Sequence, residues 1–465
     1  MGFFLTVLYL VASFLTPPVI FGPLAEFRIE LILAVLLLLV SVPKMMRSFV
    51  FRTPQALALA GLSVAASFSV FIAMRWLGGA INTWLGFIPS IYAYFLVCLH
   101  CDSRKKLQLL VIMLLFVCLF VIVNGALDLR HVTPTSGFSG SESSESAERR
   151  LWEIEHPYLF PMQDDAGQRF YRLRGLGEVH DPNDFGQLLV CEIPLLFVFW
   201  RPKKLIRNFA FVMVPASALS YGIYLTHSRG ALLALVAVVL VAARRRIGTL
   251  PAAVIAAGLF AGAMAVHFTG GRAISAEAGA DRTELWSESL QIVKSHPIFG
   301  IGLNQLPGYI GHTAHNSIVV CAAELGLFGL YFWSLFLLPT VRDTLVIASP
   351  KRVADVENAP AEEGLLPFYE RKSAVLDKAE TNRLGYCLLL SLTGFLAAGW
   401  FLSRAFVMTL FLLGGMAEVV YEMALRRGMT PPRLSLGRVL IYSVGLMIGS
   451  LTLVYVTVRI LNLAR

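Results

Sequence analysis

A succession of long apolar runs, separated by short polar or charged breaks, limits the fold of this chain more than any other feature. A run of about 20 apolar residues is what an α-helix needs to cross the hydrocarbon core of a bilayer. Of the 465 residues, 57% are hydrophobic and only 15% are charged. Soluble domains carry about 25% charged residues, so a water-soluble fold could not bury this much apolar surface. The composition also excludes a disordered chain, a coiled coil and a disulfide scaffold.

The runs predict an all-α fold, a polytopic integral membrane protein with about 12–13 transmembrane helices, the shortest runs leaving the count open by one. The first run lacks a basic residue before it and a small-residue cleavage site after it, so we expect a retained helix rather than a signal peptide. The expected spans are residues 3–21, 29–42, 56–74, 81–97, 107–123, 185–200, 209–225, 231–243, 252–268, 318–338, 386–402, 406–420 and 439–458.

The net charge of +9, from 39 basic and 30 acidic residues, is explained by topology rather than by a nucleic-acid partner. Counting the spans in order places all the larger basic clusters on one side of the membrane. Cytoplasmic loops are enriched in Lys and Arg, so this side and the amino terminus are predicted to be cytoplasmic. The clusters lie in residues 44–52, 104–106, 201–207, 244–246 and 426–433.

The predicted topology divides the chain into alternating membrane and loop segments. A large first outer loop begins with a Ser/Gly/Glu stretch at residues 136–146, which we expect to be flexible. A mixed-charge cytoplasmic segment, residues 342–383, is expected to be a solvated connector. The segments are N-terminal helices 1–124, outer loop 125–184, central helices 185–268, outer loop 269–316, helix 317–340, cytoplasmic loop 341–384 and C-terminal helices 385–465.

Polar residues gather at the outer ends of the spans in three places. In the first, residues 172–184, Pro182 and Asn183 suit a turn or helix start with Asn183 or Asp184 as the N-cap. Direct contact of this segment with a substrate is the alternative. In the second, Thr-His-Ser-Arg-Gly at 226–230, Arg229 lies at a membrane end against the positive-inside bias. An arginine there is costly unless it is paired or faces water, which favours anion binding, although a side chain that snorkels to the headgroups is the alternative.

The third place is the outer loop 269–316, which holds Arg282 and ends at His315. His315 opens an apolar helix, where the positive end of the helix dipole favours a neutral imidazole. A neutral imidazole can act as a general base near pH 7. A capping or interfacial histidine is the structural alternative.

Several familiar chemistries have no matching motif. The chain has no nucleotide-binding GxxxxGK[ST] loop, no HExxH zinc helix and no GxSxG nucleophile. His312 and His315 lack a third metal ligand in sequence, and the pair Cys98 and Cys101 lacks a second pair, so neither a metal nor a cofactor is expected. Arginines with a candidate base suit an anionic, pyrophosphate-bearing lipid, because guanidinium groups bind phosphates in a bidentate manner without a metal.

At these residues the sequence resembles the O-antigen ligase/polymerase superfamily of membrane glycosyltransferases. Ser228-Arg229-Gly230 is similar to the family's Ser-Arg-Gly element, and residues 297–302 resemble its P-x-x-G-x-G approach to the catalytic loop. His315-Asn316, nine further residues and Gly326-Leu-Phe-Gly329 match the ligase pattern H-[NSQ]-x9-G-x-x-[GTY]. The resemblance spans about residues 172–338.

The resemblance implies a metal-independent glycan transferase of the all-helical GT-C type in the bacterial inner membrane, with an active site facing the periplasm. Its donor would be an undecaprenyl-pyrophosphate-linked glycan. It implies that His315 deprotonates the acceptor hydroxyl, with inversion at the anomeric carbon, and that Arg229 and Arg282 hold the pyrophosphate. Arg174 is a third candidate for that role, and Asn316 is implied as a substrate-binding residue.

The acceptor stays open at this level: lipid A-core for a ligase, a growing polysaccharide for a polymerase, or a protein for an oligosaccharyltransferase. A transporter or flippase for lipid-linked glycans is the main alternative class. It would place ionisable groups near the membrane midplane, whereas the expected spans hold few charges, Glu324 and Glu418 among them. A scaffold would not explain arginines placed against the charge bias.

Overall fold

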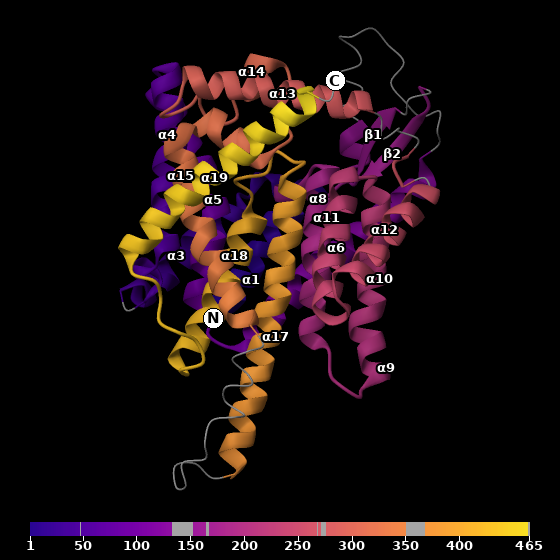
Figure 1. Cartoon of the computed structure of the whole chain (residues 1–465), viewed down its shortest axis with the longest axis vertical. Coiled ribbons are helices and arrows are strands. Elements are labelled where there is room, and N and C mark those ends of the chain that lie inside the picture. Colours follow the sequence, from indigo (N-terminus) through magenta and orange to yellow (C-terminus); the bar gives the residue numbers. More distant parts are fainter. Residues whose placement is uncertain are drawn as a thin grey trace. The chain divides into compact units, whose positions relative to one another are not determined.

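The computed structural model describes residues 1–46, 48–132, 152–163, 167–266, 268–270, 276–349 and 368–463, without the side chains of residues 276–281 and 368–377. The described chain is helical except for one two-stranded sheet (Figure 1). The all-α, polytopic membrane fold expected from the sequence is confirmed. The Ser/Gly/Glu stretch 136–146 and residues 350–367 of the cytoplasmic connector lie outside the described residues.

Each apolar run of the sequence coincides with a helix or a consecutive pair of helices. Seven helices among the described residues are long and apolar enough to cross a membrane: α4 (Pro54–Met74), α5 (Leu77–His100), α6 (Arg104–His131), the segment Leu205–Thr226 that ends in α10 (Val214–Thr226), α15 (Ser317–Ala348), α18 (Met408–Arg426) and α19 (Leu436–Leu463).

The remaining expected spans also form helices, and most of these have fewer than 18 residues. Two are short apolar helices, α1 (Gly2–Leu15) and α12 (Thr249–Ala265). Another, α11 (Arg229–Ile247), begins with an arginine and ends in three more. This is why seven helices satisfy both length and hydropathy where the sequence indicated 12–13. The others are α3 (Ile29–Met45), α8 (Pro182–Leu196) and α17 (Phe368–Gly399).

Contacts divide the chain into two compact units, and each is described by itself. Unit 1 comprises Met1–Pro43, Arg104–Ser275 and Thr393–Ala398. In it, α8 packs against α6, α10 and α11, and α12 packs against α11. The antiparallel hairpin of β1 (Leu159–Gln163) and β2 (Arg169–Leu173) contacts α6 and α10, with Leu159 paired to Leu173.

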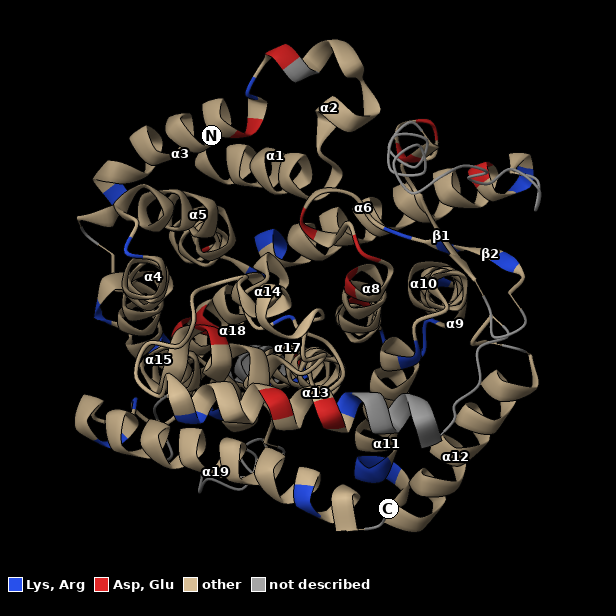
Figure 2. Cartoon of the chain, turned by 90° about the horizontal axis from the view of Figure 1, so that it is seen from above, with Lys and Arg blue, Asp and Glu red and all other residues tan. Residues whose placement is uncertain are grey.

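Unit 2 comprises Lys44–Ser103, Ala276–Leu392 and Gly399–Arg465. Its central element is α15, which packs against α4, α18 and α19. Two further helices, α13 (Ala276–Ser295) and α14 (Leu306–Ile310), contact α15 and lie at its end across the helix axes (Figure 1). Seen from above, α4, α5 and α15 are viewed nearly end-on and α13 is viewed from the side (Figure 2), while α19 runs obliquely to them (Figure 1).

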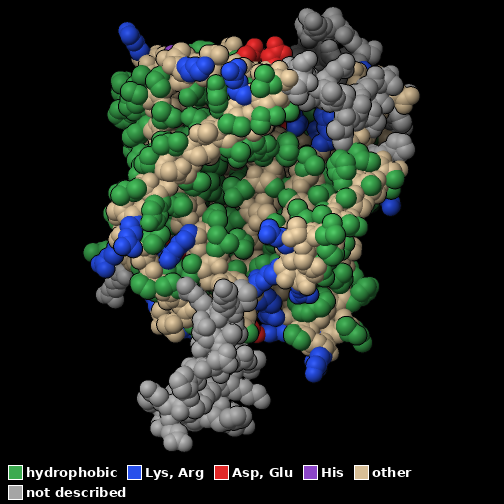
Figure 3. All heavy atoms as spheres, in the orientation of Figure 1, with side chains coloured by type: hydrophobic (Ala, Val, Ile, Leu, Met, Phe, Trp, Pro, Cys, Tyr) green, Lys and Arg blue, Asp and Glu red, His purple; other side chains and the backbone are tan. Residues whose placement is uncertain are grey.

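The surface of α19 carries large apolar side chains, as a lipid-facing helix requires. Ile441, Ile448 and Leu453 are each more than half exposed. Figure 3 shows hydrophobic side chains over the middle of the face on which α19 lies. Exposed apolar area on this scale would be unfavourable in water and is what contact with acyl chains requires.

Candidate active site

His315 is held at the entrance to α15 by a turn from far along the chain. The turn comprises residues 400–405, between α17 and α18, and is called the 400–405 turn below. The backbone N–H of His315 donates to Oγ of Ser403 at 2.8 Å. His315 has a left-handed backbone with φ of 51°, which is uncommon for a residue other than glycine and occurs often at functional sites. The bond fixes residue 315 through its backbone and does not involve the imidazole.

Asn316 and Ser317, which follow His315, also form hydrogen bonds to the 400–405 turn. Asn316 is the N-cap of α15, and its Oδ1 accepts from the N–H groups of residues 318 and 319. Its Nδ2 donates to the carbonyl of Trp400 at 3.1 Å. The Oγ of Ser317 donates to the carbonyl of Leu402 at 2.7 Å and accepts from the N–H of Arg404 at 3.0 Å. Asn316 and Ser317 are buried, so their polar atoms are used to hold the loop in place.

Helix α13 brings Arg282 to this turn. The guanidinium of Arg282 lies over the ring of Phe401, 6.0 Å from its centroid. One helical turn later, the buried indole of Trp286 donates to the carbonyl of Ala314 at 2.7 Å and meets the ring of Trp400 edge-on. Arg282 and His315, both expected from the sequence, are therefore attached to one turn.

A break in α15 explains the P-x-x-G-x-G segment. At Gly326 the backbone leaves the helical conformation, with φ of 66° and ψ of −170°. The carbonyls of Ala323 and Glu324 accept instead from the N–H groups of Ile301 and Gly302. In return, the N–H groups of residues 327 and 328 donate to the carbonyls of residues 297 and 298. The loop thus replaces the helical bonds lost at the break and is fixed against α15 by its backbone.

Two glycines allow this close approach. A Cβ on Gly300 would lie 2.4 Å from the carbonyl oxygen of Glu324, and one on Gly326 would lie 2.2 Å from that of Ile298. Both have positive φ, a region that side chains disfavour. The buried carboxylate of Glu324 accepts from the N–H of Leu306 at 3.3 Å, which fixes the start of α14. Glu324 therefore acts within unit 2 as a clamp on the loop.

Arg229 lies in unit 1, as the first residue of α11. Its neighbour Ser228 is the N-cap of that helix and donates to Oδ1 of Asn183 at 2.9 Å. Arg172, which is buried, donates to the same oxygen at 2.8 Å and to the carbonyl of Thr226 at 2.8 Å. Arg172 therefore joins β2, the start of α8 and the Ser-Arg-Gly element, while Arg229 itself is half-buried.

Arg174 is turned to a different part of unit 1. Its Nε donates to the carbonyl of Pro157 at 2.9 Å and its Nη2 to that of Glu153 at 3.5 Å. Its Nη1 lies 4.0 Å from the Glu153 carboxylate. These contacts brace the approach to β1. The helix start expected in this segment is confirmed, but its N-cap is Asp181, whose carboxylate accepts from the N–H of Asn183, and not Asn183 or Asp184 as expected. The Oδ1 of Asn183 accepts instead from Ser228 and Arg172.

The structure therefore brings together His315, Asn316 and Arg282 in unit 2, while Arg229 and Arg174 lie in unit 1. The sequence did not point to Ser403, Arg404 or Trp400, because a short turn between two apolar runs carries no recognisable motif. Arg172 stood in a segment of interest but was not distinguishable from Arg174. A signal existed for Arg404, which is another arginine at a predicted outer membrane end.

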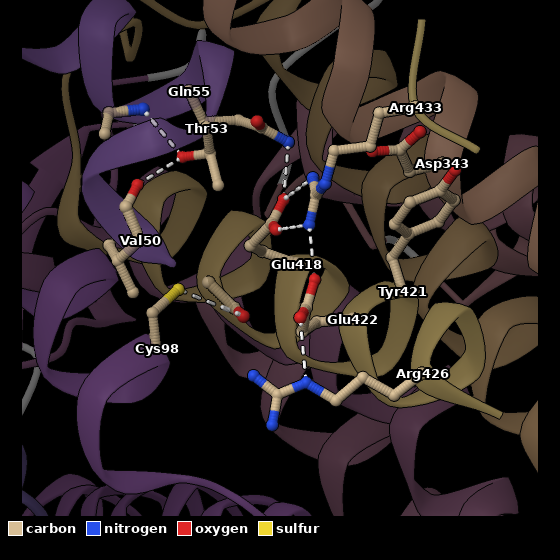
Figure 4. Close-up of polar contacts among 12 residues, drawn as sticks. Val50, Thr53, Gln55, Cys98, Asp343, Glu418, Tyr421, Glu422, Arg426 and Arg433 are labelled. Atoms are coloured by element: carbon tan, nitrogen blue, oxygen red, sulfur yellow. Dashed lines mark hydrogen bonds and ion pairs between the residues drawn. The ribbon is translucent and has the colours of Figure 1, made fainter. Parts of the chain in front are cut away.

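A second group of charges lies in unit 2, near the predicted cytoplasmic end of α18 (Figure 4). The carboxylate of buried Glu418 accepts a hydrogen bond from Nε2 of Gln55 at 2.9 Å. It also forms a bidentate ion pair with the guanidinium of Arg433. Arg433 also pairs with Glu422, which in turn pairs with Arg426, each at 2.9 Å. Burial lowers the pKa of Arg433, but the hydrogen bonds and charges of its acidic partners outweigh burial and raise it overall. We call Gln55, Glu418, Glu422, Arg426 and Arg433 the Glu418 network.

A further carboxyl within a predicted span is Glu192 of α8, which is fully buried. Neither of its oxygens has a hydrogen-bond partner among the described residues. It joins Glu324 and Glu418 as an exception to the charge-poor spans. Within the described ranges, no group of three His, Cys, Asp or Glu side chains is arranged to hold a metal ion.

The fold and this site define an all-helical, multi-pass membrane protein with arginine and histidine side chains on polar segments at the ends of its helices. Residues 213–334 match the family model described as O-antigen ligase. The match includes both the Ser-Arg-Gly element and the His315 motif, and it confirms the resemblance of this region to the O-antigen ligase/polymerase superfamily. An O-antigen ligase or polymerase type of function, with glycosyltransferase-like chemistry, is supported by this match. A search of curated proteins found no match.

Proposed function

We propose that this protein transfers a glycan from undecaprenyl pyrophosphate to an acceptor hydroxyl at the periplasmic face of the bacterial inner membrane. The reaction class is that of an O-antigen ligase, with lipid A-core as the acceptor. The observation that carries the proposal is the attachment of His315 and Arg282 to one turn, within a region that matches the O-antigen ligase family. This transfer requires a base for the acceptor hydroxyl and a cationic group that binds the pyrophosphate.

In the proposed step, the acceptor oxygen forms a bond to the anomeric carbon of the first donor sugar. The bond from that carbon to the pyrophosphate oxygen breaks, and its electron pair leaves with undecaprenyl pyrophosphate. The hydroxyl proton passes to the imidazole of His315, which later releases it to water. A single displacement of this kind inverts the anomeric configuration. The fixed backbone of residue 315 supports this role, since a general base must be oriented toward its proton.

Arg282 and Arg229 are proposed to bind the pyrophosphate and to stabilise the charge that it gains on leaving. A guanidinium fork matches phosphate oxygens in a bidentate manner, and no metal is needed to neutralise them. Arg174 and Asn316 fit a supporting role better, because their described hydrogen bonds fasten β1 and cap α15. A direct contact of either with the substrate stays a prediction.

The test is transfer by the purified protein from an undecaprenyl-pyrophosphate glycan to lipid A-core, with His315→Ala compared against His312→Ala. His312 lies on the same loop three residues earlier and is exposed, which makes it a matched control. We expect His315→Ala to lose at least about 10²-fold in rate, the usual loss on removing a general base, and His312→Ala to keep the wild-type rate. Full transfer by His315→Ala would contradict the assignment. Transfer by the wild-type protein to a polysaccharide or a protein, but not to lipid A-core, would show that the proposed acceptor is wrong.

A further inference from the structure

The 400–405 turn carries an arginine that the sequence motifs of the site do not include. It connects α17 to α18, and the predicted topology places it on the outer side of the membrane. Arg404 is half-buried there. A cation at this position runs against the positive-inside bias, as Arg229 and Arg282 do, and therefore calls for a specific reason.

The backbone of Arg404 is fixed directly beside the proposed base. Its N–H donates to Oγ of Ser317, and the N–H of His315 donates to Oγ of Ser403. These two bonds run in opposite directions between the same two segments, so residues 403 and 404 lie alongside residues 315 and 317. The indole of Trp333 adds a third attachment, since it donates to the carbonyl of Ala405 at 2.9 Å. Arg404 is thus held on both sides by bonds to α15 or its entrance.

The same turn also receives the other cation of unit 2. Arg282 packs on Phe401, three residues before Arg404. Two arginines that are more than one hundred residues apart in sequence are therefore mounted on one short turn, together with the backbone of His315. Two arginines on one turn suit a ligand with several phosphate oxygens, because each guanidinium fork can bind two of them.

We propose that Arg404 is a further binding residue for the pyrophosphate of the donor lipid, and that Ser403 is a positioning residue for His315. This inference rests on the proposed function. Arg404 would share with Arg282 the negative charge that grows on the pyrophosphate as the glycosidic bond breaks. Ser403 would set the orientation of His315 through its backbone.

The first experiment measures binding of undecaprenyl pyrophosphate to the full-length protein in detergent, for wild type, Arg404→Ala, Arg404→Lys and the control Arg459→Ala. Arg459 is an exposed arginine of α19 in the same unit. We expect Arg404→Ala to weaken binding at least about tenfold and Arg404→Lys to weaken it less, since lysine keeps the charge but not the fork. Arg459→Ala should bind as wild type. The affinity for undecaprenyl phosphate, which has one phosphate fewer, should differ less between wild type and Arg404→Ala than the affinity for undecaprenyl pyrophosphate.

Wild-type binding by Arg404→Ala, or equal weakening by Arg404→Ala and Arg459→Ala, would overturn the inference. Should Arg404→Ala fail to fold, Arg404→Lys and Arg404→Gln decide the question, because lysine keeps the charge without the fork and glutamine keeps a polar side chain without the charge. The binding measurement on the Arg404 variants is independent of the transfer rate that tests His315→Ala. Loss of binding with Arg404 variants alongside full transfer by His315→Ala would refute the proposed base and keep the binding residue.

Ser403 is tested by transfer rate at saturating donor. Ser403→Ala should lower kcat about tenfold and leave the Kd for undecaprenyl pyrophosphate unchanged, because the variant loses one hydrogen bond that orients His315. Ser403→Thr, which keeps the hydroxyl, should restore most of the rate. An unchanged kcat in Ser403→Ala, or no rescue by threonine, would contradict the positioning role.

Discussion

The Glu418 network and the surroundings of His315 use polar residues in opposite ways, although both belong to unit 2. Around Glu418, the described hydrogen bonds mostly join charged side chains to one another (Figure 4). Around His315, they join backbone groups to hydroxyl, amide and indole side chains. Charge at the first region holds the fold together. At the second, the described hydrogen bonds use neutral groups to hold the fold.

This difference separates stability from activity. A buried ion pair is costly to break because one charge is left in a medium that solvates it poorly. A site built on backbone bonds can lose a cationic side chain with a smaller effect on folding. Substitutions at the two regions should therefore affect different measurements.

The largest effect is expected for Glu418→Ala. It leaves Arg433 without its main partner, and breaking a buried pair by removing one member costs about 3–5 kcal/mol. We expect a large fall in the unfolding midpoint in detergent, while the protein that remains folded still binds undecaprenyl pyrophosphate. An unchanged unfolding midpoint, or loss of binding by the folded protein, would contradict the assignment of the Glu418 network to stability rather than activity.

A somewhat smaller effect is expected for Gly326→Ala. With φ of 66° and ψ of −170°, residue 326 lies in a backbone region that is essentially restricted to glycine, and a side chain there costs about 1–3 kcal/mol. The new Cβ would also clash with the carbonyl of Ile298. Because the break holds the loop 297–302, we expect a lower unfolding midpoint together with reduced transfer. Gly308→Ala is the control, since a Cβ there meets nothing within 4 Å. Equal behaviour of the two variants would show that the broken helix is not under the constraint inferred from its contacts.

Arg229→Lys should act on activity rather than stability. Lysine keeps the charge but cannot form the planar fork, so we expect about a tenfold loss of donor affinity or rate, equivalent to about 1.4 kcal/mol. The unfolding midpoint should change little. If donor binding and rate both stay at wild-type values, Arg229 is an interfacial arginine that reaches toward lipid headgroups.

The smallest effect is expected at the rim of the Glu418 network. Arg426 pairs with Glu422 one helical turn away, and its side chain is 66% exposed. Exposed pairs of this kind contribute about 0.2–1 kcal/mol. Arg426→Ala should therefore shift the unfolding midpoint slightly, and less at high salt. A loss comparable to that of Glu418→Ala would mean that the network acts as one unit rather than through its buried centre.

Hydropathy alone predicted the helices that coincide with the apolar runs, whereas α13 and α14 in the outer loop were not predicted. Crossing a bilayer requires a continuous apolar segment whose backbone bonds are internal, so each span is written locally in the sequence. His315 and Arg229 could also be predicted from the sequence, because each stands at the end of an apolar run. Arg282 was predicted from its place in the outer loop and from the family resemblance. The glycines at 300, 302 and 326 could be recognised as a pattern, but not explained.

Only the tertiary structure decided how those residues are held. The loop 297–302 exchanges backbone bonds with α15 at Gly326, and the 400–405 turn fastens His315 from more than eighty residues away. Each of these bonds uses a backbone group on at least one side, and every residue carries such groups, so the sequence does not reveal the partners. The distinction between Arg172 and Arg174 has the same origin, since their different partners follow from how β2 packs against α10.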